Sequence, residues 1–194
     1  ILPVSLWNCE SMRPLFFLES LKHIKEVGSF VPSSSILARR MTVRAQVDSA
    51  QTIVEIGAGT GSITRQIIKD MPVQSKLLIF EPHLPFFHHL QSLKDPRISL
   101  LSDQAQTLPF EMKKQGLFGV DCIISGLPLA NLSKNDQQKI IRIIYSALNP
   151  GGRYVQFQYS LLSYPLIRSI FRNISLSLVC RNFPPAIIYT SVKN

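Results

Sequence analysis

From Thr52 to Val192 the chain alternates short apolar runs with segments whose apolar residues recur at helical spacing. Such alternation is typical of strands joined by helical crossovers, which build a parallel sheet. The pattern predicts seven strands, at residues 52–56, 76–80, 97–101, 119–125, 153–157, 175–180 and 186–192. It predicts intervening helices at residues 62–69, 84–93, 134–148 and 165–171. The last two strands are close enough in sequence that we expect them to pair antiparallel.

Two helices are predicted before the first strand. Residues 14–27 carry their apolar side chains on one face at helical spacing. A run of three serines then offers an N-cap to a second helix at residues 36–46. The polar side of this second helix carries Arg39, Arg40 and Arg44. We interpret residues 1–48 as an N-terminal helical segment that covers a cleft or contacts a membrane, and residues 49–194 as the sheet domain.

A glycine-rich turn, Gly57-Ala58-Gly59-Thr60-Gly61, follows the first strand and leads into a helix. Glycine permits positive φ and close approach of a ligand, and the free N–H groups at a helix start face that ligand. The spacing is neither the G-x-G-x-x-G of dinucleotide enzymes nor a Walker loop. Three acids, Glu55, Glu81 and Asp103, stand at the ends of the first three strands. Ligands bind at this edge of open parallel sheets, so we expect a cradle here.

The formal net charge of +9 favours an anionic partner, either nucleic acid or an acidic lipid surface. No acidic residue follows Asp136, so the C-terminal part is strongly basic. A solvated basic rim is the alternative interpretation. Three widely spaced cysteines indicate neither a disulfide framework nor a zinc site, and they suit a reducing, cytoplasmic setting. No apolar run approaches the ~20 residues of a spanning helix, and no signal peptide is apparent.

The segment Val54–Gly61 resembles the first motif of class I S-adenosylmethionine-dependent methyltransferases, and Glu81-Pro82 and residues 102–105 are similar to the second and third motifs. The resemblance implies a Rossmann-like methyltransferase fold of the α/β class. That fold is a mostly parallel seven-stranded sheet with an antiparallel last strand and helices on both faces. It also implies S-adenosylmethionine as the cofactor. The implied cofactor-binding residues are Glu55, Gly57, Ala58, Gly59, Thr60, Gly61, Glu81, Pro82, Asp103, Gln104, Ala105, Ser125 and Gly126.

Two branches of this family fit the chain. Soluble bacterial phospholipid N-methyltransferases acting on phosphatidylethanolamine resemble it at residues 27–34, 124–129, 154–159 and 181–186. Ribosomal RNA adenine dimethyltransferases share the first motif. However, they place an amide and a stacking aromatic residue where this chain has Gly126 and Leu129. This difference favours a phospholipid acceptor, with RNA or a non-catalytic S-adenosylmethionine binder as alternatives. No obligate protein partner is evident, and we expect a cytoplasmic protein that is peripheral at the inner membrane surface.

A lipid amine would have to lose a proton before it attacks, because an alkylammonium has a pKa near ~10 and no lone pair. The expected catalytic residues are Leu127, Pro128 and Tyr159. In this hypothesis carbonyl groups of the loop accept from the amine and Tyr159 orients it, so much of the acceleration comes from positioning. Expected substrate-binding residues are Phe30, Ser33, Ser34, Leu129, Arg39 and Arg40, the two arginines facing anionic headgroups. No metal-ligand cluster is visible in the sequence.

Overall fold

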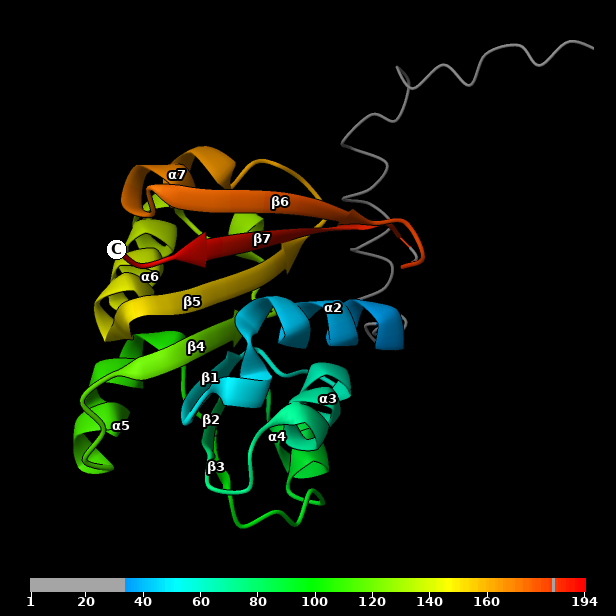
Figure 1. Cartoon of the computed structure of the whole chain (residues 1–194), viewed down its shortest axis with the longest axis vertical. Helices are drawn as coiled ribbons and strands as arrows, with labels where there is room; N and C mark the ends of the chain where they lie inside the picture. The colour runs from blue at the N-terminus through cyan, green and yellow to red at the C-terminus, as the bar shows by residue number, and fades with distance from the viewer. Residues whose placement is uncertain (1–33, 183) are drawn as a thin grey trace, which may run out of the picture. The chain divides into compact units, whose positions relative to one another are not determined.

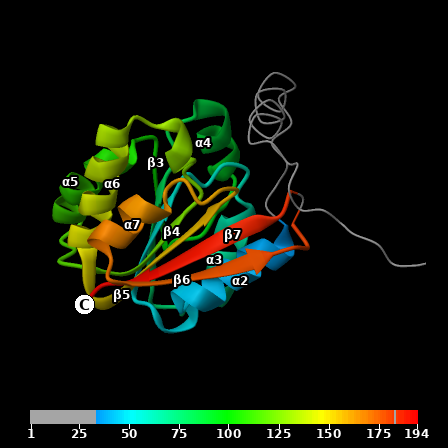
Figure 2. The same cartoon turned by 90° about the horizontal axis from the view of Figure 1, so that it is seen from above.

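The computed structural model describes residues 34–182 and 184–194. The helix predicted at residues 14–27, together with Phe30 and Ser33, lies outside these ranges. The described residues form three layers, a central sheet with helices on both faces (Figures 1 and 2). This arrangement confirms the α/β class predicted from the alternating pattern.

One seven-stranded sheet has the order β3-β2-β1-β4-β5-β7-β6. Its strands are β1 (Thr52–Ile56), β2 (Lys76–Phe80), β3 (Ile98–Leu101), β4 (Val120–Ser125), β5 (Leu148–Gln158), β6 (Asn173–Val179) and β7 (Ala186–Val192). The first five strands pair in parallel, whereas β7 is antiparallel to both β5 and β6. The predicted antiparallel last strand is therefore confirmed. Because β1 lies between β2 and β4, the strand order reverses there, and ligands of open α/β sheets bind at such a reversal.

Two apolar cores lie on the two faces of the sheet, and alternate strand residues point into them. In β1, for example, Ile53 belongs to one core and Val54 to the other. The first core is covered by α2 (Ser35–Ala45) and α3 (Ser62–Asp70). The second is covered by α5 (Leu108–Lys114), α6 (Lys134–Ala147) and α7 (Tyr164–Ile170). The remaining elements are α4 (Leu84–Leu90), η1 (Val47–Ser49), η2 (Ala105–Thr107) and η3 (Leu129–Asn131).

Three elements differ from the sequence-based prediction. Helix α5 was not predicted, α4 ends three residues earlier than expected, and β5 begins five residues before the predicted strand at residues 153–157. The pairing of β4 with β5 shifts register between Val120 and Cys122, so β5 is irregular around Gly151 and Gly152. Gly151 has a φ of 78°, and its N–H donates to the carbonyl of Lys193 (2.8 Å). Pairing with the C-terminal strand thus extends β5 through residues that favour a turn.

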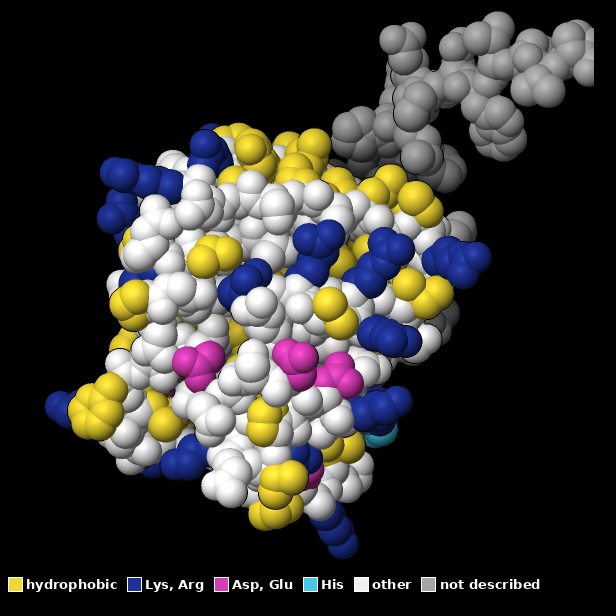
Figure 3. All heavy atoms as spheres, viewed as in Figure 1, with side chains coloured by type: hydrophobic (Ala, Val, Ile, Leu, Met, Phe, Trp, Pro, Cys, Tyr) yellow, Lys and Arg dark blue, Asp and Glu magenta, His cyan; other side chains and the backbone are white. Residues whose placement is uncertain are grey.

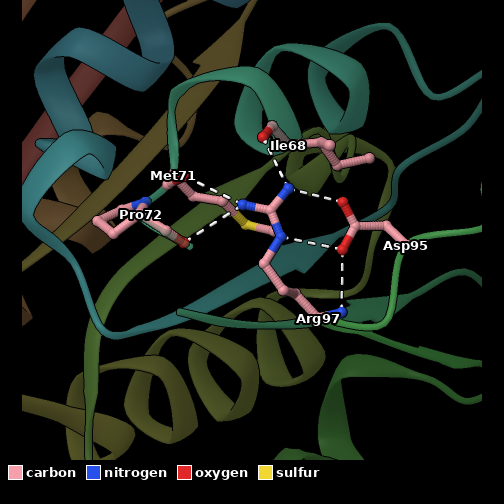
Figure 4. A network of polar contacts seen from close by, with 5 residues as sticks. All are labelled: Ile68, Met71, Pro72, Asp95 and Arg97. Atoms are coloured by element: carbon pink, nitrogen blue, oxygen red, sulfur yellow. Dashed lines mark hydrogen bonds and ion pairs between the residues drawn. The ribbon is translucent and has the colours of Figure 1, made fainter. Parts of the chain in front are cut away.

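Arg97, which directly precedes β3, ties the start of that strand to the end of α3 (Figure 4). Its guanidinium donates to the carbonyls of Ile68, Met71 and Pro72 and forms an ion pair with Asp95 (2.6 Å). These bonds fix the strand ends that lie opposite the glycine turn. Within the described ranges, no helix has the length and apolarity needed to cross a membrane.

Candidate functional site

Three strand ends meet at the glycine turn. The Gly57 N–H donates to the Phe80 carbonyl at the end of β2 (2.8 Å). The Gly126 N–H, which follows β4, donates to the Ile56 carbonyl at the end of β1 (2.9 Å). The structure therefore brings the turn, the second strand end and the loop after β4 to one edge of the sheet.

The three glycines of the turn all have positive φ, but they serve different purposes. The values are 73° at Gly57, 55° at Gly59 and 76° at Gly61. A Cβ on Gly61 would lie 2.8 Å from the Leu90 side chain, and one on Gly57 would lie 3.4 Å from the Leu127 nitrogen. A Cβ on Gly59 would meet no atom within 4 Å. Gly59 is thus the position where the turn leaves open space for a ligand to approach the backbone.

Glu81 holds this turn in place. Its side chain is buried, and its carboxylate accepts from the N–H of Gly59 (2.7 Å) and from the N–H of His83 (3.0 Å). A carboxylate has about four acceptor positions, so lone pairs remain for the hydroxyl groups of a ligand. The acid predicted to bind a ribose therefore also positions the backbone of the glycine turn.

Glu55 is a buried carboxyl group without a hydrogen-bond partner. Only 1% of its surface is exposed, and neither of its oxygens is hydrogen-bonded within the described residues. Burial raises the pKa of Glu55 to about 8, the Thr64 hydroxyl opposes this, and the charge of Glu81 adds to it. At neutral pH the group is therefore mostly protonated. A cationic ligand at the turn would favour the charged form, so this orphaned acid fits a cation.

The other expected cofactor contacts lie around the same edge. Asp103 and Gln104 are exposed after β3, the neighbour of β2, whereas Ala105 is buried where η2 begins. The remaining positions in and beside the turn are Ala58, which is buried, Thr60, which is partly exposed, and Pro82, which is exposed. Open space beside Gly59 and three acids around it suit a cationic nucleoside. The residues present therefore fit S-adenosylmethionine.

Gly126 is required by close packing between two strand ends. A Cβ at this position would lie 2.8 Å from the Gly57 carbonyl oxygen, which is backbone and cannot turn aside. The adjacent Ser125 is fully buried, and its hydroxyl accepts from the Leu127 N–H (3.2 Å). Both expected cofactor positions therefore shape the loop after β4, whatever else they bind.

Two glutamines from β5 hold the carbonyl of Leu127. The side-chain amides of Gln156 and Gln158 donate to it at 2.7 and 2.9 Å. The Tyr154 hydroxyl in turn donates to the Gln156 side-chain oxygen. Burial raises the pKa of Tyr154, so this hydroxyl keeps its proton. We call Tyr154, Gln156 and Gln158 the loop clamp. None of the three was expected to have a role in the site, although polar residues at alternate positions of an apolar strand are a usable signal.

The loop clamp corrects the expected role of the loop carbonyls. The Leu127 carbonyl already accepts from the two glutamines and from the Leu129 N–H (2.8 Å), and the Pro128 carbonyl accepts from the Asn131 N–H (3.0 Å). The Leu127 carbonyl therefore has no lone pair left for an amine, whereas the Pro128 carbonyl, with one donor, keeps one. Leu127 and Pro128 can still border the acceptor, because the first is partly exposed and the second is exposed.

Leu129 was expected to contact a lipid acceptor, but its side chain lies in the core. Its side chain is 0% exposed and packs in the core beneath α6 and α7, with Val54 and Ile140 among the members of that core. A residue buried in this way offers no surface to a lipid chain. The expectation that Leu129 contacts the substrate is therefore wrong, and the missing aromatic residue does not create an apolar pocket here.

Ser34 and Tyr159 lie near each other through Asn182. The Ser34 hydroxyl caps α2 by accepting from the Leu37 N–H (3.1 Å), and its N–H donates to the Asn182 side chain (3.1 Å). Burial raises the pKa of Tyr159, and a hydrogen bond with Asn182 opposes this, so the phenol is neutral at physiological pH. Arg39 and Arg40 are exposed on the outer side of α2. In the described part of the chain, no cluster of three or more His, Cys, Asp or Glu could hold a metal ion.

The comparisons with known proteins agree with this geometry. A family model described as a methyltransferase domain matches residues 53–152. Ornithine lipid N-methyltransferase of Singulisphaera acidiphila is 27% identical over 178 residues, which cover 90% of this chain and 93% of that protein. A methyltransferase structure from Geobacter sulfurreducens covers 92% of this chain and 90% of its own, with a TM-score of 0.62 at 12% identity. Human N-acetylserotonin methyltransferase in complex with SAM covers 93% of this chain and 56% of its own, with a TM-score of 0.60 at 14% identity.

The matched span of the family model contains the glycine turn, the three acids and the loop after β4, and it covers more than half of the chain. The likeness to solved structures concerns the fold, which is the arrangement observed here. The chain therefore belongs to the methyltransferase domain family and is a class I S-adenosylmethionine-dependent methyltransferase.

Proposed function

We propose that this enzyme methylates the amino group of a membrane lipid headgroup, of the phosphatidylethanolamine or ornithine lipid type. The observation that carries the proposal is the similarity to an ornithine lipid N-methyltransferase over nearly the whole of both chains. The basic charge of the protein agrees with a substrate embedded in an anionic surface. Phosphatidylethanolamine and ornithine lipid share a primary amine as the group to be methylated.

The main chemical task of the protein is to present a neutral amine. S-adenosylmethionine, when bound, supplies the methyl group. An alkylammonium with a pKa near ~10 must lose a proton, and a site with little water lowers that pKa. Tyr159 is a weak base because its phenol is neutral, so it can orient the amine by a hydrogen bond but not remove its proton. We therefore assign proton removal to water and assign most of the rate enhancement to positioning.

Replacing Gln158 by methionine tests whether the loop clamp positions the acceptor. The Leu127 carbonyl would lose one of its three donors and the loop would gain freedom. We expect kcat to fall about tenfold, because small misplacements of reacting groups are costly, with a KM for S-adenosylmethionine close to that of the wild type. The unfolding free energy should fall by only about 1 kcal/mol.

The matched control is Gln137→Met, which removes a similar bond from a side-chain amide to the Leu132 carbonyl (2.9 Å). Steady-state kinetics and urea denaturation of the two variants separate loss of positioning from loss of stability. Equal kcat values for the Gln158 and Gln137 variants would show that the clamp only stabilises the fold.

The acceptor is tested by a methyl-transfer assay with radiolabelled S-adenosylmethionine. Liposomes containing phosphatidylethanolamine, liposomes containing ornithine lipid, phosphatidylcholine liposomes and ribosomal RNA are offered side by side. We expect label in one or both amine lipids and none in phosphatidylcholine, whose nitrogen already carries three methyl groups. Label in RNA alone would contradict the lipid proposal, and S-adenosylmethionine binding without transfer to any acceptor would indicate a non-catalytic binder.

A further inference from the structure

The outward face of α2 has an unusual composition for a solvated helix. Apart from Ser35, the residues that it turns away from the core recur at helical spacing and comprise two apolar residues and three arginines, the last of them half-buried, with no acid among them. They are Ile36, Arg39, Arg40, Val43 and Arg44. Val43 is 66% exposed although nothing on this face requires an apolar side chain for folding. A helix face that is both basic and apolar is typical of elements that lie against anionic lipid.

A groove of about 910 Å³ continues this face toward β6 and β7. None of the residues that line it is acidic. Its arginines come from α2, from the middle of β5 and from the loop after β6, so segments far apart in the sequence converge here. We call it the arginine groove, after Arg39, Arg40, Arg44, Arg153 and Arg181.

The charges of the arginine groove are not neutralised by the described residues. Among the described residues, the ion pairs are those of Arg97 with Asp95 and of Lys114 with Glu111, and neither involves a residue of the groove. Arg40 donates to the Leu178 carbonyl (3.0 Å) and Arg153 to the Gln46 side chain (2.8 Å). These neutral partners orient two guanidinium groups without cancelling their charge. Five cations held close together in this way repel one another, and an external anion relieves that repulsion.

Apolar side chains stand at the margin of the same surface. On the edge strand β6, Leu176 is 41% and Leu178 is 55% exposed. Figure 3 shows Lys and Arg side chains in a row across this face, with the acidic side chains grouped to one side of the row. A flat anionic surface that meets the α2 and β6 side can therefore contact arginines and leucines together, with the acids to one side of the contact.

We propose that the arginine groove and the exposed leucines of β6 form the surface by which this enzyme docks on an anionic lipid bilayer. The groove binds the phosphates of neighbouring lipids, while the amine acceptor is bound elsewhere, at the edge with the glycine turn. This inference rests on the proposed function for its biological sense, but docking is a property of the surface and is measurable without any acceptor.

Co-sedimentation with vesicles tests the docking surface on the full chain. The vesicles contain phosphatidylcholine alone or phosphatidylcholine with phosphatidylglycerol, and neither lipid offers a methylatable amine. We expect binding only with phosphatidylglycerol, and weaker binding at high salt. The variant Arg44→Gln/Arg181→Gln should bind these vesicles about 30-fold more weakly, since each basic residue near an anionic leaflet contributes about 1 kcal/mol.

The control Lys113→Gln/Lys139→Gln removes the same charge from exposed positions on α5 and α6 and should bind like the wild type. Comparing two variants of the full chain cancels any contribution of residues 1–33. Equal binding of the two double variants, or binding that is indifferent to phosphatidylglycerol, would overturn the docking surface. Equal binding of the two double variants together with label in an amine lipid refutes this inference alone, whereas label in RNA with docking intact refutes only the acceptor.

Discussion

An alanine at Gly59 is expected to abolish S-adenosylmethionine binding in a protein that still folds. The added Cβ would meet no protein atom within 4 Å, so it projects into the space left for the ligand. An L-residue at a φ of 55° costs about 1–2 kcal/mol, which a folded domain tolerates. Isothermal titration calorimetry should show an affinity reduced at least 30-fold, equivalent to about 2 kcal/mol.

Gly116 provides a matched control for this substitution. It also has positive φ (67°) and open space at its Cβ position, but it follows α5 and lies outside the site. Gly116→Ala should lose a similar amount of stability and bind S-adenosylmethionine with unchanged affinity. If Gly59→Ala also bound normally, the open space at the turn would not be the cofactor site.

The stability of the protein without its cofactor is expected to fall as the pH rises from 5 to 8, and Glu55→Gln should remove most of that fall. The folded-state pKa of Glu55 is raised to about 8 from an ordinary value of 4.5. The stabilising contribution of the bound proton is therefore fully present below pH 4.5 and is lost as the pH rises through 8. Between pH 4.5 and pH 8 the loss of folding stability is on the order of 5 kcal/mol, because each unit of pKa shift corresponds to about 1.4 kcal/mol.

Urea denaturation at pH 5, 6, 7 and 8 measures this dependence. The difference between wild type and the Glu55 variant should grow with pH. Parallel curves for wild type and Glu55→Gln would mean that Glu55 is ionised in the folded protein at neutral pH.

The sequence was sufficient for most of the sheet, because strands buried on both faces are continuous apolar runs. Bounds were correct for β1, β2 and β7, and neighbouring strands were off by a residue or two. Helix α5 escaped prediction because it has only seven residues, contains a proline near its start and buries a glutamate, which breaks the apolar pattern. The start of β5 escaped because pairing of Leu148 with Val120 of β4, and hydrogen bonds of Gly151 and Gly152 with Lys193 after β7, overrode a sequence that favours a turn.

The candidate site was predictable where it depends on position along the chain. Glu55, Glu81 and Asp103 come together because each stands at a strand end and those strands are neighbours in the sheet. What depends on side-chain packing was not predictable. The burial of Leu129 and the contacts of the loop clamp arise from α6, α7 and β5, whose docking no local pattern records. The arginine groove likewise joins residues more than a hundred positions apart.

Helix α2 carries a consequence for the order in which the chain folds during synthesis. Its cap at Ser34 is bonded to Asn182, 148 residues away, and Arg40 is bonded to the Leu178 backbone, 138 residues away. Those partners are synthesised well over a hundred residues after α2, so the helix cannot complete its contacts until they have been made. Until then its apolar side chains, including Leu37 and Met41, lack part of the core against which they pack. A nascent chain that has not yet reached these partners would therefore expose the apolar side of this helix.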